Sequence, residues 1–298
     1  MPEILKLRGL FMKGNLLDLS GKIDKVRLLA FEKVSKVADY LGIPFFIIGA
    51  AARDLILMNG HNIPTIRATL DIDFGVQVPS WDQYLRLKQG LMETGEFTET
   101  EDVQRMMFHS SLRIDLIPFG PIADNTSTIK WPPSQEIVMS VLGFEESFRH
   151  SQTVRLSSNP KLDIKIVTLA GLAAMKIISW KDRYPERDRD ASDLALIIRN
   201  YTDAGNVERI FDEALDLVDS EDFDYVSVGA RLLGRDIAVI LSTDAKAVVL
   251  EILNNETGKQ DRYRLLEDMM RSDLLLTNDF EDVLRWLEEV KTGILEGI

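Results

Sequence analysis

The amino-acid sequence predicts an α+β fold, in which a β-sheet with flanking helices is followed by a mainly helical C-terminal region. Short apolar runs that end at glycine or proline alternate with segments of helical periodicity in the first half of the chain. From about residue 203 onward the periodicity is helical and the composition is acidic. We therefore expect a first domain over residues 1–160 and a mainly helical domain over residues 161–298.

The first domain is expected to mix helices and strands. Apolar and charged positions at helical spacing predict helices over residues 21–41, over 50–60, and from the capping residue Ser80 to about Met92. Apolar or alternating runs predict strands over residues 44–49, 68–78 and 148–156, and two or three strands within 97–120. Residues 121–143, with two prolines near their centre, are expected to form a loop.

The second domain is expected to begin inside a continuous segment. Residues 162–183 start with an extended pattern and become strongly helical, and Pro185 breaks that helix. A further helix is expected over residues 189–201. The remainder of the chain is expected to be helical.

Composition narrows the chemistry that the chain can support. It has no cysteine, which excludes disulfides, thiolate zinc sites and cysteine nucleophiles. The three histidines, His61, His109 and His150, are scattered, so a histidine-based zinc site is not expected. A bound metal would rest on oxygen ligands, which favours a hard cation such as Mg²⁺ or Mn²⁺.

Neither a secretion signal nor a membrane span is expected. The first 20 residues lack an apolar core with a cleavage site, and no window of about 18 uncharged apolar residues occurs. We therefore expect a cytoplasmic protein that does not enter a membrane.

The net charge of −13 is concentrated in the last third of the chain. Residues 203–298 contain 23 of the 48 acidic and 10 of the 35 basic residues, which leaves 25 of each sign in residues 1–202. The acidic third is expected to be a solvated helical face, or else a docking face for a basic partner. The neutral remainder can still carry a local basic patch.

A pair of aspartates stands in the run TLDIDF. On a strand, side chains two residues apart point to the same face, so Asp71 and Asp73 project side by side while Leu70, Ile72 and Phe74 face the core. Two carboxylates about 7 Å apart along a strand repel each other unless a cation lies between them. Such a pair on a strand is usually a solvated face, and in phosphoryl-transfer sites it holds Mg²⁺.

A third acid strengthens the metal-binding interpretation. Asp115 stands in the apolar run LRIDLIPF, between Ile114 and Leu116. A carboxylate in an apolar strand is unfavourable unless it is paired. A metal ion shared with Asp71 and Asp73 would account for its presence.

A glycine precedes these acids at the turn from a predicted strand into a predicted helix. Gly49 would let the backbone approach a ligand closely, and the following helix N-terminus would offer N–H groups to a phosphate. A glycine at such a turn also occurs in ordinary packing. It gains weight here because the aspartate pair follows it.

These segments resemble the nucleotidyltransferase superfamily, whose pattern joins a glycine-containing turn, an Asp-x-Asp strand and a third aspartate on a later strand. Over residues 25–200 the chain looks most like the AbiEii/AbiGii-type toxin nucleotidyltransferases. The segments that carry this resemblance are GAAARD at 49–54, RATLDIDF at 67–74, RIDLIP at 113–118 and KIISWKDRYPERDRDASDL at 176–194. The chain departs from the pattern at Ala50, where the family usually has a second glycine or a serine.

The resemblance implies a nucleotidyltransferase-type mixed β-sheet and a two-metal transfer of NMP from an NTP. Mg²⁺ (or Mn²⁺) would be held by Asp71, Asp73 and Asp115, and Asp115 would help to deprotonate the nucleophile. Lys176 would steady the triphosphate, as a fourth catalytic residue. Nucleotide binding would involve Gly49, Ala50, Arg67, Lys176, Asp190 and Asp193.

The three predicted site residues of the second domain, Lys176, Asp190 and Asp193, can also be explained without a role in the reaction. Lys176 could be a lysine that keeps only its charged end in solvent. Asp190 and Asp193 could orient Lys176, contact the base or ribose, or simply favour the start of their helix. The resemblance favours a contribution of residues Lys176 to Leu194 to the site.

The resemblance further implies an NTP substrate, tRNA or another RNA as acceptor, and a partner antitoxin. Three alternatives remain open. CCA-adding tRNA nucleotidyltransferases share the first motifs, but their downstream base-selecting motif is not found at a fitting place. A small molecule could instead be the acceptor, or the chain could be a catalytically inactive nucleotide-binding module, which the presence of all three acids disfavours.

Overall fold

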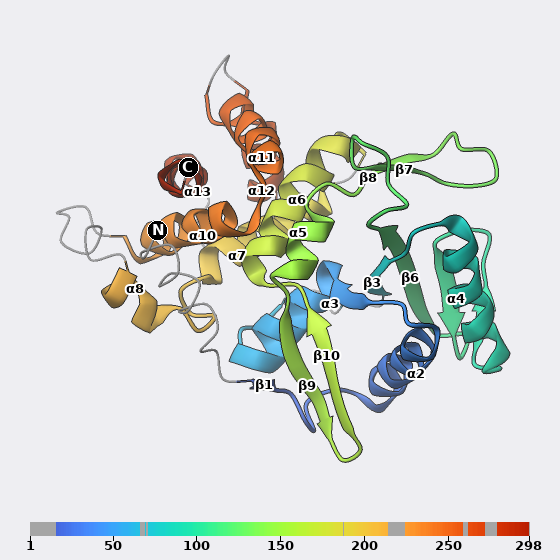
Figure 1. Ribbon diagram of the computed structural model, residues 1–298. Coiled ribbons are helices and arrows are strands. Elements are labelled where there is room, and N and C mark those ends of the chain that lie inside the picture. Colours follow the sequence, from blue (N-terminus) through green and yellow to red (C-terminus); the bar gives the residue numbers. More distant parts are fainter. Residues whose placement is uncertain are drawn as a thin grey trace, which may run out of the picture.

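The first half of the described chain is built on a mixed β-sheet, which lies to one side of the helical half (Figure 1). The structure, a computed structural model, describes residues 16–65, 69, 71–186, 188–213, 224–258, 262–271 and 279–297. Within these residues, eight strands pair in the order β1-β9-β10-β2-β3-β6-β5-β4. Their bounds are β1 Leu17–Asp18, β2 Phe45–Ile48, β3 Asp71–Gln77, β4 Phe97–Glu99, β5 Arg105–Phe108, β6 Leu112–Phe119, β9 Gln152–Ser158 and β10 Lys161–Ile166.

Helices from the first half of the chain flank this sheet (Figure 1). They are α2 Lys25–Leu41, α3 Gly49–Asp54, the π-helical turn η1 Leu55–Gly60, α4 Trp81–Glu93 and α5 Phe144–Arg149. Helix α2 packs against α4, whereas α3 follows β2 directly and contacts β3. The ends of α2 and α4 follow local sequence signals, because Gly42 ends α2 in the left-handed conformation and Ser80 caps α4 by accepting the N–H of Gln83.

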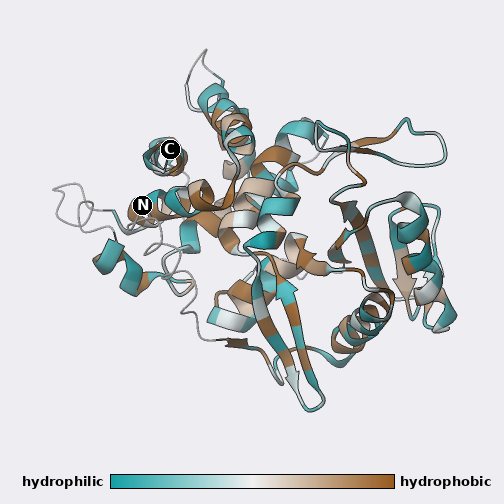
Figure 2. Cartoon of the chain, viewed as in Figure 1, coloured by the Kyte–Doolittle hydropathy of each residue, from teal (hydrophilic) through white to brown (hydrophobic). Residues whose placement is uncertain are grey.

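The second half of the described chain is helical. Its helices are α6 Leu169–Arg183, α7 Arg189–Asn200, α8 Val207–Glu213, α10 Tyr225–Ile240, α11 Thr243–Glu256, α12 Arg264–Met270 and α13 Phe280–Glu296. Figure 2 shows apolar and polar residues interleaved along the strands and the helices, and the core takes apolar residues from both halves, such as Ile72, Leu233 and Val290. Helix α6 joins the two halves, since it contacts α5 and α3 as well as α7, α10 and α11. None of the described helices is both long and apolar enough to cross a membrane.

The α+β prediction is confirmed, including the sheet with flanking helices and the helical C-terminal region. The helices expected over residues 21–41 and 189–201 and the strands expected at 44–49 and 68–78 are present with small shifts at their ends. Residues 97–120 form three strands. The segment 162–183 is strand followed by helix, as its pattern predicts.

Two expectations were wrong in part. Residues 121–143 are not all loop, because β7 Thr128–Lys130 and β8 Val138–Ser140 pair as a small hairpin. The strand expected over 148–156 begins only at Gln152, because α5 occupies the preceding residues. Phe144 and Phe148 lie one helical turn apart in α5, and both pack on Phe119 of the sheet, which favours a helix there.

Close packing of two helices stabilises the helical half. Helices α10 and α13 approach so closely that a Cβ at Gly234 would overlap the carbonyl oxygen of Val290, and one at Gly293 would overlap that of Arg231. Both clashes involve backbone atoms, which cannot rotate out of the way as a side chain can. The two glycines therefore set the distance between these helices.

We expect Gly234→Ala to destabilise the protein. Helix propensity alone would favour alanine by about 1 kcal/mol, but the clash should reverse the sign and give a net loss of about 1–3 kcal/mol. Chemical denaturation of the variant beside Val239→Ala, an exposed position of α10, would measure this difference. A more stable Gly234→Ala protein would show that the two helices are not held at this distance.

Candidate active site

The register of the sheet brings the three predicted acids together. Strand β3 runs parallel to β6, with Asp73 opposite Asp115 and Asp71 opposite Arg113. Ile72 is fully buried whereas Asp71 and Asp73 are half-buried, as expected for alternating faces of a strand. Neighbouring strands lie about 4.8 Å apart, so Asp73 and Asp115 are adjacent on the same face.

Two arginines neutralise part of this negative charge. Arg105, on β5 opposite Asp115, donates from Nε and Nη2 to the two oxygens of Asp115, each at 2.8 Å. These hydrogen bonds raise the pKa of Arg105. Arg113 Nε lies 2.8 Å from Asp71 Oδ1. Both carboxylates therefore face a guanidinium.

Gly49 makes room for the carboxylate of Asp73. Its φ of +67° lies in the left-handed region that favours glycine, and a Cβ there would overlap Asp73 Oδ2. Ala50 follows, half-buried, in the first turn of α3, where no side chain caps the helix. The glycine thus accommodates an aspartate, and the adjacent N–H groups of the helix start remain without a side-chain cap.

The acids offer only oxygen donors to a metal ion. Within the described part of the chain, no three acidic or histidine side chains converge closely enough to hold a metal as they stand. Yet Asp71 Oδ1 is buried and accepts no hydrogen bond, because the nearby Arg113 N–H does not point at it. An unsatisfied carboxylate oxygen beside two further acids fits a hard cation such as Mg²⁺.

Lys176, Asp190 and Asp193 form a buried cluster between α6 and α7. The Nζ of Lys176 lies 2.6 Å from Asp190 Oδ1 and 2.6 Å from Asp193 Oδ2. Ser179 Oγ donates to the other oxygen of Asp190 at 2.9 Å. The interpretation of Lys176 as a lysine with a solvated end is wrong, because its side chain is only 8% exposed. Orientation of Lys176 by the two aspartates agrees with the structure.

This cluster continues into the first half of the chain. Arg53 of α3 donates to Asp193 Oδ1 and, at 2.9 and 2.6 Å, to Asp54 Oδ1. Burial alone favours a neutral amine at Lys176, but the charges of Asp193 and Asp190 outweigh it and raise its pKa. Lys176 is therefore charged at neutral pH, and the cluster links α3 to α6 and α7.

The sequence analysis did not single out some residues of the site, and one predicted residue lies outside the described part of the chain. Arg67, a predicted nucleotide contact, lies outside the described residues. Arg53, Arg105 and Arg113 were not singled out. For Arg53 and Arg113 a signal existed, since each is a charged residue inside a segment that carries the family resemblance. Arg105 had none, because only the β5–β6 register places it against Asp115.

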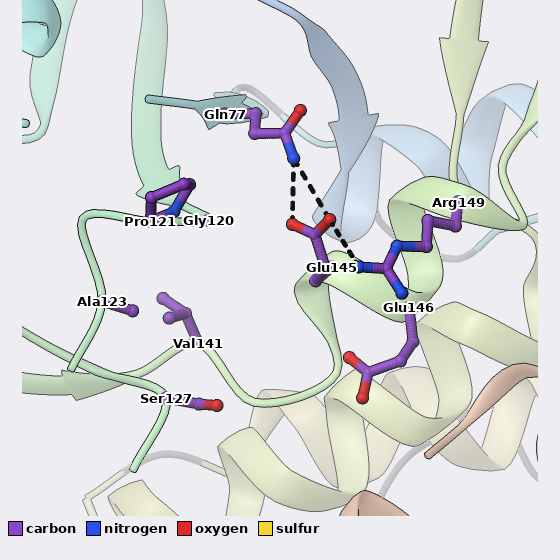
Figure 3. A pocket seen from close by; sticks show the side chains of 9 residues that line it. All are labelled: Gln77, Gly120, Pro121, Ala123, Ser127, Val141, Glu145, Glu146 and Arg149. Atoms are coloured by element: carbon purple, nitrogen blue, oxygen red, sulfur yellow. Dashed lines mark hydrogen bonds and ion pairs between the residues drawn. The ribbon is translucent and has the colours of Figure 1, made fainter. Parts of the chain in front are cut away.

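A separate hollow of about 300 Å³ lies at the far end of β3 (Figure 3). Gln77, the last residue of β3, donates there to both oxygens of Glu145 on α5, and Arg149 pairs with the same carboxylate at 3.1 Å. Neither Asp71, Asp73 nor Asp115 lines it. It is therefore distinct from the acid cluster.

Comparison with known protein families gives one match. The family model described as "Nucleotidyl transferase AbiEii toxin, Type IV TA system" matches residues 55–286, more than half of the chain. A search of curated proteins finds no significant match.

Several solved structures show remote likeness. The antibiotic-resistance factor ANT(2'')-Ia is 12% identical, with 66% of this chain and 96% of that one covered and a TM-score of 0.35. An antigenic nucleotidyltransferase-like protein from Paracoccidioides brasiliensis is 14% identical, with 65% and 91% covered and a TM-score of 0.37. The Thermotoga maritima CCA-adding enzyme complexed with tRNA is 13% identical, with 93% and 83% covered and a TM-score of 0.26. Likeness at this level says nothing about activity.

We expect Lys176→Met to destabilise the protein strongly. The substitution leaves Asp190 and Asp193 buried without their shared cation, a change that typically costs about 3–5 kcal/mol. Chemical denaturation should show this loss, whereas Lys181→Met, at an exposed position of the same helix, should change stability by less than about 0.5 kcal/mol. Equal stability of the two variants would contradict the buried ion cluster.

Proposed function

This chain belongs to the AbiEii nucleotidyltransferase toxin family, and we propose that it transfers an NMP from an NTP to an RNA acceptor with the help of Mg²⁺ or Mn²⁺. The observation that carries the proposal is the adjacency of Asp73 and Asp115, with Asp71 on the same face, in a chain of this family. An antitoxin as partner is supported by the family's description as a toxin of a toxin–antitoxin system, and RNA as acceptor is proposed on the family resemblance alone.

We assign two roles to the three acids: they bind the metal, and Asp115 also accepts a proton. Asp71, Asp73 and Asp115 would hold the metal, which when bound would supply positive charge to the phosphates and lower the pKa of a bound hydroxyl. Asp115 takes the proton from the acceptor hydroxyl. The hydroxyl oxygen forms a bond to the α-phosphorus, the bond from that phosphorus to the bridging oxygen of the β-phosphate breaks, and pyrophosphate leaves. Atoms and charge balance without a further reactant.

Lys176 and its aspartates are proposed to bind the triphosphate. The charged amine of Lys176, held by Asp190 and Asp193, would supply positive charge to the phosphates. Gly49 and Ala50 are proposed to offer backbone N–H groups at the start of α3 to the same phosphates. Arg67 is proposed as a further phosphate contact on the family resemblance alone.

We further propose a division of the chain close to residue 160. The strands fall before Val167 and the long helices α6, α7, α10, α11 and α13 after it. Lys176 and the aspartates of α7 would then complete, from the helical side, a site that begins on the sheet. The cytoplasm, where NTPs and RNA occur together, is proposed as the place of action.

The transfer is tested with α-labelled NTPs, Mg²⁺ and total RNA. We expect label to enter RNA from one preferred NTP, and the Asp71→Asn/Asp73→Asn variant to lose at least about 10²-fold in rate. Asp163→Asn is a matched control, because Asp163 is also a strand aspartate paired with an arginine, on β10. It should retain activity.

The other outcomes decide between the alternatives. Label on the protein itself would point to self-modification. No label, but a rise in melting temperature with NTP, would favour a small-molecule acceptor. No label and no stabilisation by any NTP would contradict the proposal and favour an inactive binding module.

Metal dependence is checked in the same assay. Excess EDTA should abolish transfer, and added Mg²⁺ or Mn²⁺ should restore it, because hard cations prefer oxygen ligands. Transfer that persists after exhaustive chelation would show that the acids act without a metal.

A further inference from the structure

Two acids of the candidate site, Asp115 and Asp71, form ion pairs with arginines. Both oxygens of Asp115 accept from Arg105 at 2.8 Å, and Arg113 Nε lies 2.8 Å from Asp71 Oδ1. A carboxylate whose two oxygens both accept from a guanidinium has two of its about four lone pairs engaged, and so is a poorer ligand for a metal ion. The positive charges that a metal would bring to Asp115 and Asp71 are therefore supplied in part by arginines.

We propose that Arg105 and Arg113 are exchangeable cations of this site, which compete with the metal for Asp115 and Asp71 and, once released, bind the phosphates of the incoming nucleotide. This inference rests on the proposed function. It assigns a nucleotide-binding role to two residues outside the set of acids and lysine described above. It also predicts that metal and nucleotide bind together more readily than either binds alone.

Charge and exposure make the exchange feasible. A guanidinium and a divalent metal repel each other, so each weakens the binding of the other to a shared carboxylate. Arg105 and Arg113 are 25% and 42% exposed, which leaves their side chains room to turn away from the sheet. The pairing of Arg113 with Asp71 is incomplete, since Asp71 Oδ1 accepts no hydrogen bond from it.

The released arginines need a new anion. Arg105 retains one neighbour, Asp102, whose carboxylate lies 2.9 Å from Nη1 and is 53% exposed. Such an exposed pair contributes little to stability, so it offers little resistance to a stronger partner. A triphosphate arrives with the metal and presents the multiple anionic oxygens that guanidinium groups bind well.

The sheet provides a matched control pair. Arg155 on β9 donates to both oxygens of Asp163 on β10, at 2.9 and 3.1 Å. The exposed fraction of Arg155, 25%, equals that of Arg105. Strands β9 and β10 lie on the other side of β2 from the acids, so this pair shares the chemistry of Arg105–Asp115 without its location.

The test measures metal and nucleotide affinity separately. Mn²⁺ binding is followed by the electron paramagnetic resonance signal of free Mn²⁺, first without nucleotide. The α,β-methylene analogue of each NTP is then titrated at saturating Mn²⁺. Wild type, Arg105→Met, Arg113→Met and Arg155→Met are compared, with Arg105→Lys as a second variant that keeps the charge but loses the paired hydrogen bonds.

The expected effects have opposite signs. For Arg105→Met and Arg113→Met we expect Mn²⁺ alone to bind about 5-fold tighter or more, and the nucleotide analogue to bind about 5-fold weaker or more. Arg105→Lys should show both effects to a smaller degree, and Arg155→Met should show neither. A merely structural role would not strengthen metal binding.

The failures are distinguishable. Unchanged or weaker Mn²⁺ binding in both methionine variants, with wild type binding Mn²⁺ and transferring label, would overturn this inference alone. Unchanged nucleotide affinity would do the same. Absence of Mn²⁺ binding to wild type even with every nucleotide analogue would overturn both this inference and the metal-dependent function.

Discussion

The parallel pairing of β3 with β6 imposes the constraint on which the rest of the site depends. It fixes Asp73 beside Asp115 on one face of the sheet, with Asp71 one step along the same strand. Three carboxylates in so small an area repel one another, and partial burial strengthens that repulsion. The fold must therefore supply positive charge here, and two of its arginines stand on β5 and β6 at the matching positions. The same acids also require a glycine at position 49, since any side chain there would displace Asp73.

A second set of charges holds the helical half against the sheet. Asp193 of α7 accepts from both Lys176 of α6 and Arg53 of α3, so one carboxylate joins three helices. A buried pair of this kind contributes less to stability than to geometry, because the desolvation of its members offsets much of their attraction. Breaking it leaves an uncompensated charge, and so the relative placement of these helices is strongly specified. Lys176 is held at a defined place relative to α3 in consequence.

The sequence predicted those features that depend on neighbours along the chain. The alternation of Asp71, Ile72 and Asp73 is a period of two that any exposed-and-buried strand shows. The strand-to-helix change over residues 162–183 was equally visible in its pattern. The hairpin at 128–140 was not, because strands of three residues carry too few positions to establish a period, and nearby prolines suggest a loop.

Pairings across strands and between distant helices escaped prediction for a different reason. Arg105 pairs with Asp115 only because the turn between β5 and β6 sets the register of the two strands. In that turn His109 and Ser110 have positive φ, a conformation that these residue types do not by themselves predict. Arg53 meets Asp193 across 140 residues, a contact that no local pattern encodes. The three acids could be grouped from chemistry alone, since a shared cation explains them, but their counter-charges could not.

Helix α3 connects these two systems of charge. Its first residue, Gly49, borders the carboxylate of Asp73, and its fifth, Arg53, binds Asp193 of the Lys176 cluster. Arg53 stands four positions after Gly49, a rise of about 6 Å along the helix, so a shift of α3 that changed the clearance at Asp73 would also strain the pairing at Asp193. The acids on the sheet and the lysine on the helical side are thus positioned by one short, rigid element. A site divided between two halves of a chain can keep a fixed geometry in this way, because residues of both halves contact the same helix.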